Sequence, residues 1–112
     1  MKKYHLRFKN IVPHEVAVAV SGGADSMAAL DFLRRPGRDI LVLHMNHGTS
    51  FADEAQSLVE RYCSQHDIPL VVGLLDKEIT PGRSKEDFWR ESRYEFFEAN
   101  RRERKVVTCH HL

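Results

Sequence analysis

The sequence predicts a single α/β domain with a doubly wound parallel sheet. Four apolar runs of strand length alternate along the chain with three segments of helical period. An apolar run without polar alternation is typical of a strand buried on both faces of a parallel sheet. Each connection is long enough for a right-handed helical crossover. Because 112 residues accommodate one domain of this kind, we expect a Rossmann-like core with four strands.

The first predicted unit is a strand over 15–20 followed by a helix from Ser26 to Arg35. The strand reads E-V-A-V-A-V, a run of small and β-branched residues that suits a buried position. Pro36 and Gly37 end the helix. The helix is expected to face the core with Met27, Leu30 and Leu33.

The second predicted unit is a strand from Asp39 to Met45, a loop over 46–48 and a helix from about Phe51 to His66. Ser50 and Asp53 have the spacing of a capping box, with Asp in place of the usual Glu or Gln. The inner face of this helix is predicted from its period to hold Ala55, Leu58, Val59, Tyr62 and Cys63.

The third predicted unit is a strand from Pro69 to Leu75, a loop over 76–84 and a long helix that ends near Arg104. Ser84 and Asp87 repeat the capping spacing at the start of that helix. Its buried face is predicted to use Phe88, Trp89, Ser92, Phe96 and Phe97.

A fourth strand is predicted from Val106 to Cys109, close to the last residue of the sequence. We expect it to leave a sheet edge that no following helix covers. Self-association, or a partner chain that completes the sheet, would cover such an edge.

Composition and charge describe an ordinary globular protein. Hydrophobic residues make up 42% and charged residues 29% of the sequence, with a net charge of +1. Cys63 and Cys109 stand far apart without metal-ligand spacing, which suits free thiols in a reducing cytosol. No signal peptide and no run of roughly 20 apolar residues is present, so we expect a soluble cytoplasmic protein without membrane contact.

The hexapeptide Ser21-Gly22-Gly23-Ala24-Asp25-Ser26 is the strongest candidate site. Two glycines allow positive φ, and their N–H groups beside a helix N-terminus would cradle phosphate oxygens with two serine hydroxyls. Asp25 would repel phosphate alone, so it predicts a bridging Mg²⁺ or a helix cap. An isolated Gly-Gly pair is more often a plain turn, but the full hexapeptide between strand and helix favours phosphate. No lysine follows as in a Walker A loop.

The end of the second strand is a candidate adenine site because ligands of doubly wound sheets bind at the carboxyl ends of the strands. Backbone groups of His44 and Met45 would hold the adenine edge, and Met45 would pack on its face. The alternative places Met45 in the core and leaves His47 as a solvated loop histidine.

Arginine and histidine side chains supply further candidates. Arg90 and Arg93 share a helix face, where they would clamp phosphate or pair with neighbouring glutamates. His110 and His111 follow the last strand, and at most one of them would reach phosphate or metal; the alternative is a polar chain end. The basic run over 101–105 would touch RNA phosphates or form a solvated helix end.

Four stretches of this sequence resemble the N-type ATP pyrophosphatases, the PP-loop superfamily, and within it the tRNA(Ile)-lysidine synthetases. They are V-A-V-A-V-S-G-G-A-D-S over 16–26, L-H-M-N-H-G over 43–48, W-R-E-S-R-Y-E-F-F over 89–97 and T-C-H-H-L over 108–112. The first resembles the pyrophosphate loop of the superfamily. The others are similar to the lysidine branch.

The resemblance implies an adenine nucleotide alpha hydrolase-like fold and a ligase that forms a carbon–nitrogen bond. ATP and Mg²⁺ would be its cofactors, and tRNA and L-lysine its partners. It implies that Ser21, Gly22, Gly23, Ala24 and Ser26 hold phosphate and that Asp25 holds the metal. Among the arginines it points to Arg93, which with Asp25 would be catalytic, while His44, Met45 and His110 would line the nucleotide site.

The family pattern continues beyond H-H with two aspartates and a Glu-Thr pair, whereas this sequence ends at Leu112. The expectation is therefore the front half of a catalytic domain, either a fragment or a shortened relative. Two alternatives stay open. One is another enzyme of the superfamily, such as a tRNA thiolase, which needs reactive cysteines. The other is a nucleotide-binding module without turnover.

Overall fold

The computed structural model describes residues 4–5, 12–46, 48, 51–74 and 85–108. They form a five-stranded sheet in the order β1-β5-β2-β3-β4, in which every pairing is parallel. The elements follow one another as β1 (Tyr4–His5), β2 (Glu15–Ala19), α1 (Ala24–Arg34), β3 (Asp39–Asn46), α2 (Ala52–Gln65), β4 (Leu70–Leu74), α3 (Lys85–Asn100) and β5 (Lys105–Thr108). The predicted α/β class and parallel sheet are confirmed.

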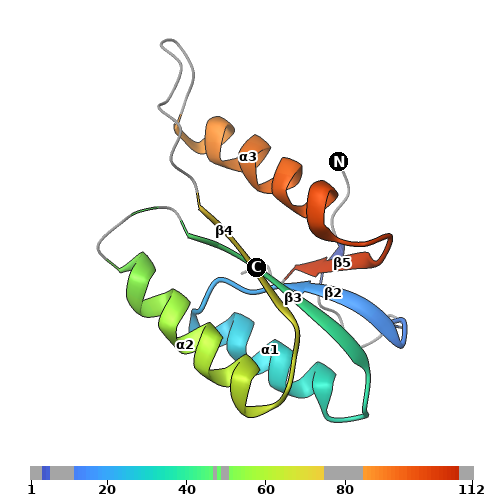
Figure 1. Cartoon of the computed structure of the whole chain (residues 1–112). Coiled ribbons are helices and arrows are strands. Elements are labelled where there is room, and N and C mark those ends of the chain that lie inside the picture. The colour runs from blue at the N-terminus through green and yellow to red at the C-terminus, as the bar shows by residue number, and fades with distance from the viewer. Residues whose placement is uncertain (1–3, 6–11, 47, 49–50, 75–84, 109–112) are drawn as a thin grey trace.

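Helices cover both faces of the sheet, as a doubly wound core requires (Figure 1). α1 and α2 lie on one face, where the core residues are Val16, Val18, Val20, Leu30, Leu33, Ile40, Val42, Val59, Cys63 and Val107. α3 lies on the other, where Phe96 and Phe97 pack against Ala17, Leu41 and Leu43. Alternate residues of β2 and β3 thus face opposite layers, which explains why their sequences show no polar alternation.

The position of the last strand differs from the prediction. β5 is not at an edge, because it pairs with β2 on one side and with β1 on the other. The expectation that this strand leaves an uncovered edge is therefore wrong. The sequence analysis missed β1, since two residues carry no recognisable period. Within the described sheet, β1 and β4 are the outer strands.

Two helix boundaries differ from the prediction because the backbone conformation at the helix end, and not the hydrophobic period, sets them. α1 begins two residues earlier than predicted, because Gly23 is its N-cap with an extended backbone. α3 ends at Asn100 and not near Arg104. The reason is that Arg102 and Glu103 adopt positive φ values of 53° and 65°, which no α-helix contains.

The start and the inner face of α2 also differ in part from the prediction. Its N-cap is Phe51, and no side chain caps it; Ser50 of the predicted capping box lies outside the described residues. Leu58 is 41% exposed, so its predicted place in the core is wrong. Ala52, Val59 and Cys63 form the buried stripe instead, and Leu58 lies beside it because neighbouring helix residues point about 100° apart.

A polar cluster joins α1 to α2. The Tyr62 hydroxyl donates to Asp31 Oδ1 over 2.7 Å and accepts from Arg34 Nε over 2.5 Å. Arg34 also pairs with Asp31, at 3.0 Å between Nη2 and Oδ1. The hydrogen bond from Tyr62, followed by that from Arg35, lowers the pKa of Asp31 to about 2. The cluster fixes how the two helices that flank the candidate loop lie against each other.

Each of the described helices is too short or too polar to cross a membrane.

Candidate functional site

The candidate loop connects the end of β2 to the start of α1 at the carboxyl edge of the sheet (Figure 1). The buried β2 run anchors its beginning, and Val20 is 3% exposed. The loop then rises to the surface, where Ser21, Gly23, Ala24 and Asp25 are exposed and Ser26 is buried again. The sequence-predicted residues 21–26 thus form one compact turn at the edge where nucleotides bind in such folds.

Gly22 is required at its position for two reasons. Its φ is 91°, a left-handed conformation that residues with a Cβ rarely adopt. A Cβ added there would also lie 2.7 Å from the Cβ of Ala55 in α2. Gly23, by contrast, has a φ of −76°, so the expectation that both glycines use positive φ holds for Gly22 alone. The close approach of Gly22 and Ala55 shows that the loop packs directly against α2.

Two serine hydroxyls accept hydrogen bonds from the backbone N–H groups of the loop. Ser26 Oγ accepts from the N–H groups of Ser21 and Gly22, each over 3.2 Å, and donates to the Gly23 carbonyl over 3.1 Å. Ser21 Oγ accepts from the Gly23 N–H over 3.2 Å and lies 3.1 Å from Ser26 Oγ. The amides predicted to face a ligand thus converge on oxygen atoms at a helix start.

Asp25 and Ala24 occupy the exposed first turn of α1. Gly23 has no side chain with which to cap the helix, so the N-terminal amides keep their affinity for an anion. The N-cap position is occupied by Gly23, and Asp25 lies inside the first turn. A role of its carboxylate as a metal ligand stays a prediction, and the described residues contain no cluster of three or more His, Cys, Asp or Glu side chains that could hold a metal ion.

His44 and Met45 end β3 beside the loop, but their side chains differ in setting. His44 is only 2% exposed, and its Nδ1 lies 2.7 Å from the Val20 carbonyl. Met45 is half-buried. Adenine binding by the backbone of these two residues stays a prediction, and His47 lies outside the described residues.

Asn46 is a buried polar residue beside the candidate site whose structural role the sequence did not reveal, because it was expected in a loop. It is the last residue of β3 and 4% exposed. Its amide donates to Asp53 Oδ1 over 3.2 Å and to Gln56 Oε1 over 2.8 Å, while its Oδ1 accepts from Gly48 N–H. Asn46 therefore ties the first turns of α2 to β3 and holds Ala55 against Gly22. An asparagine directly after an apolar strand was the available signal.

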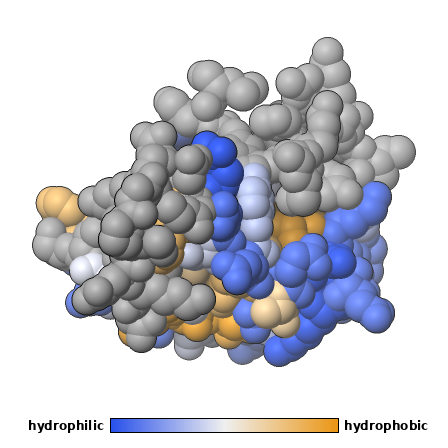
Figure 2. All heavy atoms as spheres, turned by 90° about the horizontal axis from the view of Figure 1, so that it is seen from above, coloured by the Kyte–Doolittle hydropathy of each residue, from blue (hydrophilic) through white to orange (hydrophobic). Residues whose placement is uncertain are grey.

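The predicted arginines lie on the opposite layer. Arg90 and Arg93 are exposed on α3, and the view on the α3 side in Figure 2 shows mainly hydrophilic residues with smaller apolar areas. Arg93 lies near the middle of α3 (Lys85–Asn100), about one turn before Phe96, which packs over Gly73 near the carboxyl end of β4. Its role stays a prediction. His110 and His111 lie outside the described residues.

The basic run over 101–105 reaches the other end of the sheet. Arg104 has a side chain only 13% exposed. It donates to the Asp39 carbonyl over 2.8 Å and to the Val16 carbonyl over 3.4 Å. Arg104 is thus neither a solvated helix end nor placed for RNA: it joins the turn after α3 to the starts of β2 and β3.

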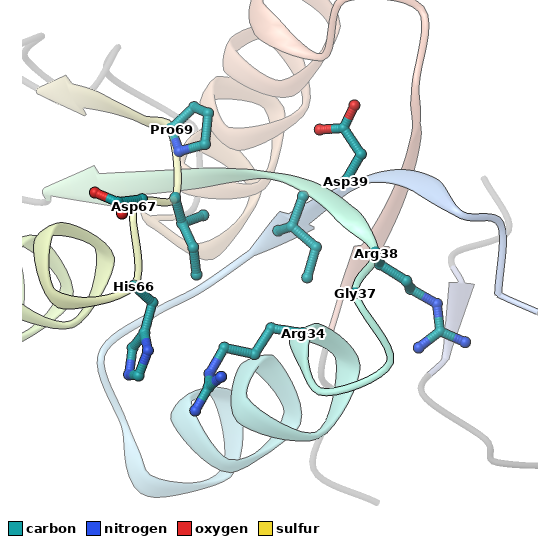
Figure 3. A pocket seen from close by; sticks show the side chains of 9 residues that line it. Arg34, Gly37, Arg38, Asp39, His66, Asp67 and Pro69 are labelled. Carbon is teal, nitrogen blue, oxygen red and sulfur yellow. The ribbon is translucent and has the colours of Figure 1, made fainter.

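A surface hollow of about 300 Å³ also lies at this amino end (Figure 3). Ile40, Ile68 and Pro69 line it together with polar residues that include Arg34, Arg38, Asp39 and His66. In Figure 3 the side chains of Arg34 and His66 extend in the same direction, and Asp39 extends the opposite way. Because the hollow is formed where β3 and β4 begin, it is separate from the loop at their far ends.

Comparison with known proteins places the chain among nucleotide-binding domains. A family model described as a PP-loop domain matches residues 1–112. The chain is 35% identical over 108 residues to a bifunctional protein TilS/HprT of Listeria innocua, covering 87% of this chain and 17% of that protein. It is 37% identical over 82 residues to a tRNA(Ile)-lysidine synthase of Mycoplasmopsis pulmonis, covering 71% and 27%. A lysidine synthase of Vibrio vulnificus is 32% identical over 90 residues, covering 76% and 21%. The chain thus spans only about a quarter or less of these relatives.

Proposed function

Because the chain belongs to the PP-loop family, we propose that it binds ATP at loop 21–26 and serves the adenylation of a tRNA base, as a lysidine synthetase does. The observation that carries this proposal is the convergence of the Ser21 and Gly22 amides on one oxygen, Ser26 Oγ, at the start of α1. A helix N-terminus with converging backbone donors favours phosphate.

The lengths of the hydrogen bonds from the loop amides suggest that a phosphate oxygen could replace the serine hydroxyls as their acceptor. The bonds from Ser21 N, Gly22 N and Gly23 N are each 3.2 Å long, at the long end for N–H···O bonds. Charged acceptors make shorter and stronger bonds than neutral hydroxyls. A phosphate oxygen would therefore compete well for the same amides, and the freed hydroxyls of Ser21 and Ser26 would donate to it.

The proposed reaction is the one that the resemblance to the lysidine synthetases implies, and relatives with that name are 32–37% identical to this chain. The C2 oxygen of a cytidine would attack the α phosphorus of ATP and release pyrophosphate. The amine of lysine would then attack C2 and release AMP, leaving lysidine. This chain would contribute mainly positioning and stabilisation of phosphate charge, from the loop amides and from Arg93 on α3. Asp25 is the residue that would hold Mg²⁺, and the ion would supply positive charge beside the phosphates.

A tRNA thiolase of the same superfamily is a weaker candidate. Such chemistry needs a reactive thiolate. Cys63 is 2% exposed, and burial raises the pKa of its thiol to about 11. A cysteine in that state is a core residue and no nucleophile. Cys109 lies outside the described residues.

Titration calorimetry with ATP and Mg²⁺ tests the binding step. We expect saturable binding of ATP by the wild-type chain, and no heat at millimolar nucleotide would contradict the proposal. Pyrophosphate release with tRNA(Ile) and lysine tests the second step. Release that needs both tRNA and lysine would support the lysidine reaction, whereas ATP binding without release would favour a module without turnover.

Replacing Asp25 by Asn separates the metal role from the phosphate role. We expect Asp25→Asn to weaken Mg·ATP binding by roughly tenfold, about the effect of one charged contact. In excess EDTA the same variant should bind free ATP as well as, or better than, the wild type, because a carboxylate that repels phosphate has gone. Equal affinities of both proteins for Mg·ATP would contradict a metal role.

A further inference from the structure

The first peptide group of the loop is held from both sides. The Val20 carbonyl lies 2.7 Å from Nδ1 of His44, and the N–H of the same peptide, that of Ser21, donates to Ser26 Oγ over 3.2 Å. The backbone ladder ends one residue earlier, with Ala19 opposite Leu43, although Val20 N–H still donates to the Leu43 carbonyl. The His44 side chain of β3 thus bonds to the backbone at the point where β2 ends and the loop begins.

The partner of Nδ1 defines the state of the ring. A carbonyl oxygen can only accept a hydrogen bond, so Nδ1 of His44 carries a proton. In the neutral ring Nε2 is then an acceptor. Nε2 is buried and has no hydrogen-bond partner among the residues that the structure describes, and the whole residue is 2% exposed. An unpaired acceptor in the core is unfavourable, so packing alone favours an apolar residue at this position.

The surroundings of His44 connect it with both walls of the loop. His44 and Asn46 lie on the same face of β3, two residues apart, and both are buried. Asn46 holds α2 through Asp53 and Gln56, and α2 presses Ala55 against Gly22. One buried polar residue therefore fixes the entry to the loop, and the other fixes the helix on which the loop rests.

We propose that the side chain of His44 is a positioning residue for phosphate binding. Its Nδ1–H sets the plane of the Val20–Ser21 peptide. This plane directs the Ser21 N–H, and it fixes where the following peptide, which carries the Gly22 N–H, begins. The histidine tolerates an unpaired Nε2 because no apolar residue can donate to the Val20 carbonyl. This inference rests on the proposed binding of ATP at the loop. It differs from the sequence-based expectation, which used only the backbone of His44.

Two substitutions separate the donor from the bulk of the ring. His44→Leu removes both the donor and the unpaired acceptor, whereas His44→Asn keeps an N–H close to the position of Nδ1. Because His44→Leu replaces the unpaired Nε2 by an unpaired Val20 carbonyl, we expect it to melt close to the wild-type temperature yet to bind Mg·ATP roughly tenfold more weakly, which is the effect of about one hydrogen bond. His44→Asn should bind within about threefold of the wild type, on the same scale.

Tyr62→Phe is the matched control, because it removes a hydrogen bond between α1 and α2 away from the loop. It should lower the melting temperature and leave the affinity for Mg·ATP unchanged. Equal affinity of His44→Leu and the wild type would overturn the proposal. An equal loss in His44→Leu and His44→Asn would also overturn it, since the donor would then not matter.

Nitrogen-15 NMR of the ligand-free chain keeps the proposal testable if His44→Leu does not fold or if the wild type binds no ATP. We expect a His44 ring protonated at Nδ1 and bare at Nε2, and amide resonances of Ser21 and Gly22 that shift little in His44→Asn. The opposite tautomer would overturn the positioning role. Absence of ATP binding with the expected tautomer would instead contradict the proposed function and leave the positioning of the loop established.

Discussion

At the scale of single residues, Gly22 shows how one position can depend on two separate constraints. Its φ of 91° is a local property, and glycine in a strand–helix turn is a recognisable signal for it. The approach of Ala55, which leaves 2.7 Å for an added Cβ, is a contact between elements that lie far apart in the sequence. The two constraints can be separated by experiment because Gly37 has a positive φ but no close neighbour.

Gly22→Ala is expected to destabilise the fold more than Gly37→Ala. Gly37 has a φ of 83° and open space where a Cβ would lie, so its replacement adds strain of about 1–2 kcal/mol. At Gly22 the same strain is joined by overpacking against α2, typically another 1–3 kcal/mol. Chemical denaturation of both variants measures the difference. Equal losses of free energy of unfolding would show that Ala55 yields without resistance.

At the scale of elements, α1 and α2 are joined by a polar cluster that no local pattern indicates. Asp31 and Tyr62 come from different helices, and their hydrogen bond of 2.7 Å forms only when the helices pack. Arg34 completes the cluster from α1. Because both helices flank the candidate loop, this cluster stabilises the walls of the site without touching it.

Stability should fall as the pH falls from about 4 to about 2. The folded pKa of Asp31 is about 2, below its ordinary value of 3.8. At pH values well above 3.8 the carboxylate is charged in both states and its interactions stabilise the fold fully. Below that value the unfolded chain takes up the proton first, so this stabilisation is lost until the folded group is also protonated. Denaturation curves between pH 6 and 2 measure the slope.

Asp31→Asn is the control for that experiment, and Tyr62→Phe is a graded version of it. Asp31→Asn should start less stable at pH 6 and lose less stability on acidification than the wild type. Tyr62→Phe removes the hydrogen bond that contributes most to the lowered pKa of Asp31, so its slope should lie between the two. Parallel curves for all three proteins would contradict the assignment to Asp31.

At the scale of the whole molecule, the residues at the two ends of the sheet have different roles. The carboxyl end carries the loop, His44 and Asn46. The amino end carries Arg104, which ties the turn after α3 to the starts of β2 and β3. Basic residues near a helix end had suggested a solvated or RNA-binding surface, but the turn directs Arg104 back onto the sheet.

Arg104→Ala should therefore lower global stability and leave nucleotide affinity unchanged. Loss of hydrogen bonds from a charged donor to two carbonyls predicts a decrease of about 1–3 kcal/mol in the free energy of unfolding. Arg102→Ala removes an exposed arginine from the same turn and should change stability by less than about 0.5 kcal/mol. Denaturant titration and calorimetry with Mg·ATP measure the two effects. Weaker binding by a folded Arg104→Ala protein would show that the ends are coupled.

The sequence by itself determined the α/β class, the order along the chain of the strands β2 to β5 and the three helices, and the place of the loop between β2 and α1. These follow from local period and from turn chemistry, which act between residues close together in the chain. Only the tertiary structure decided that β5 lies between β1 and β2, that Ala55 rests on Gly22, and that His44 holds Val20. Such contacts join segments that lie far apart in the sequence. The local pattern around a residue does not specify which distant segment it will pack against.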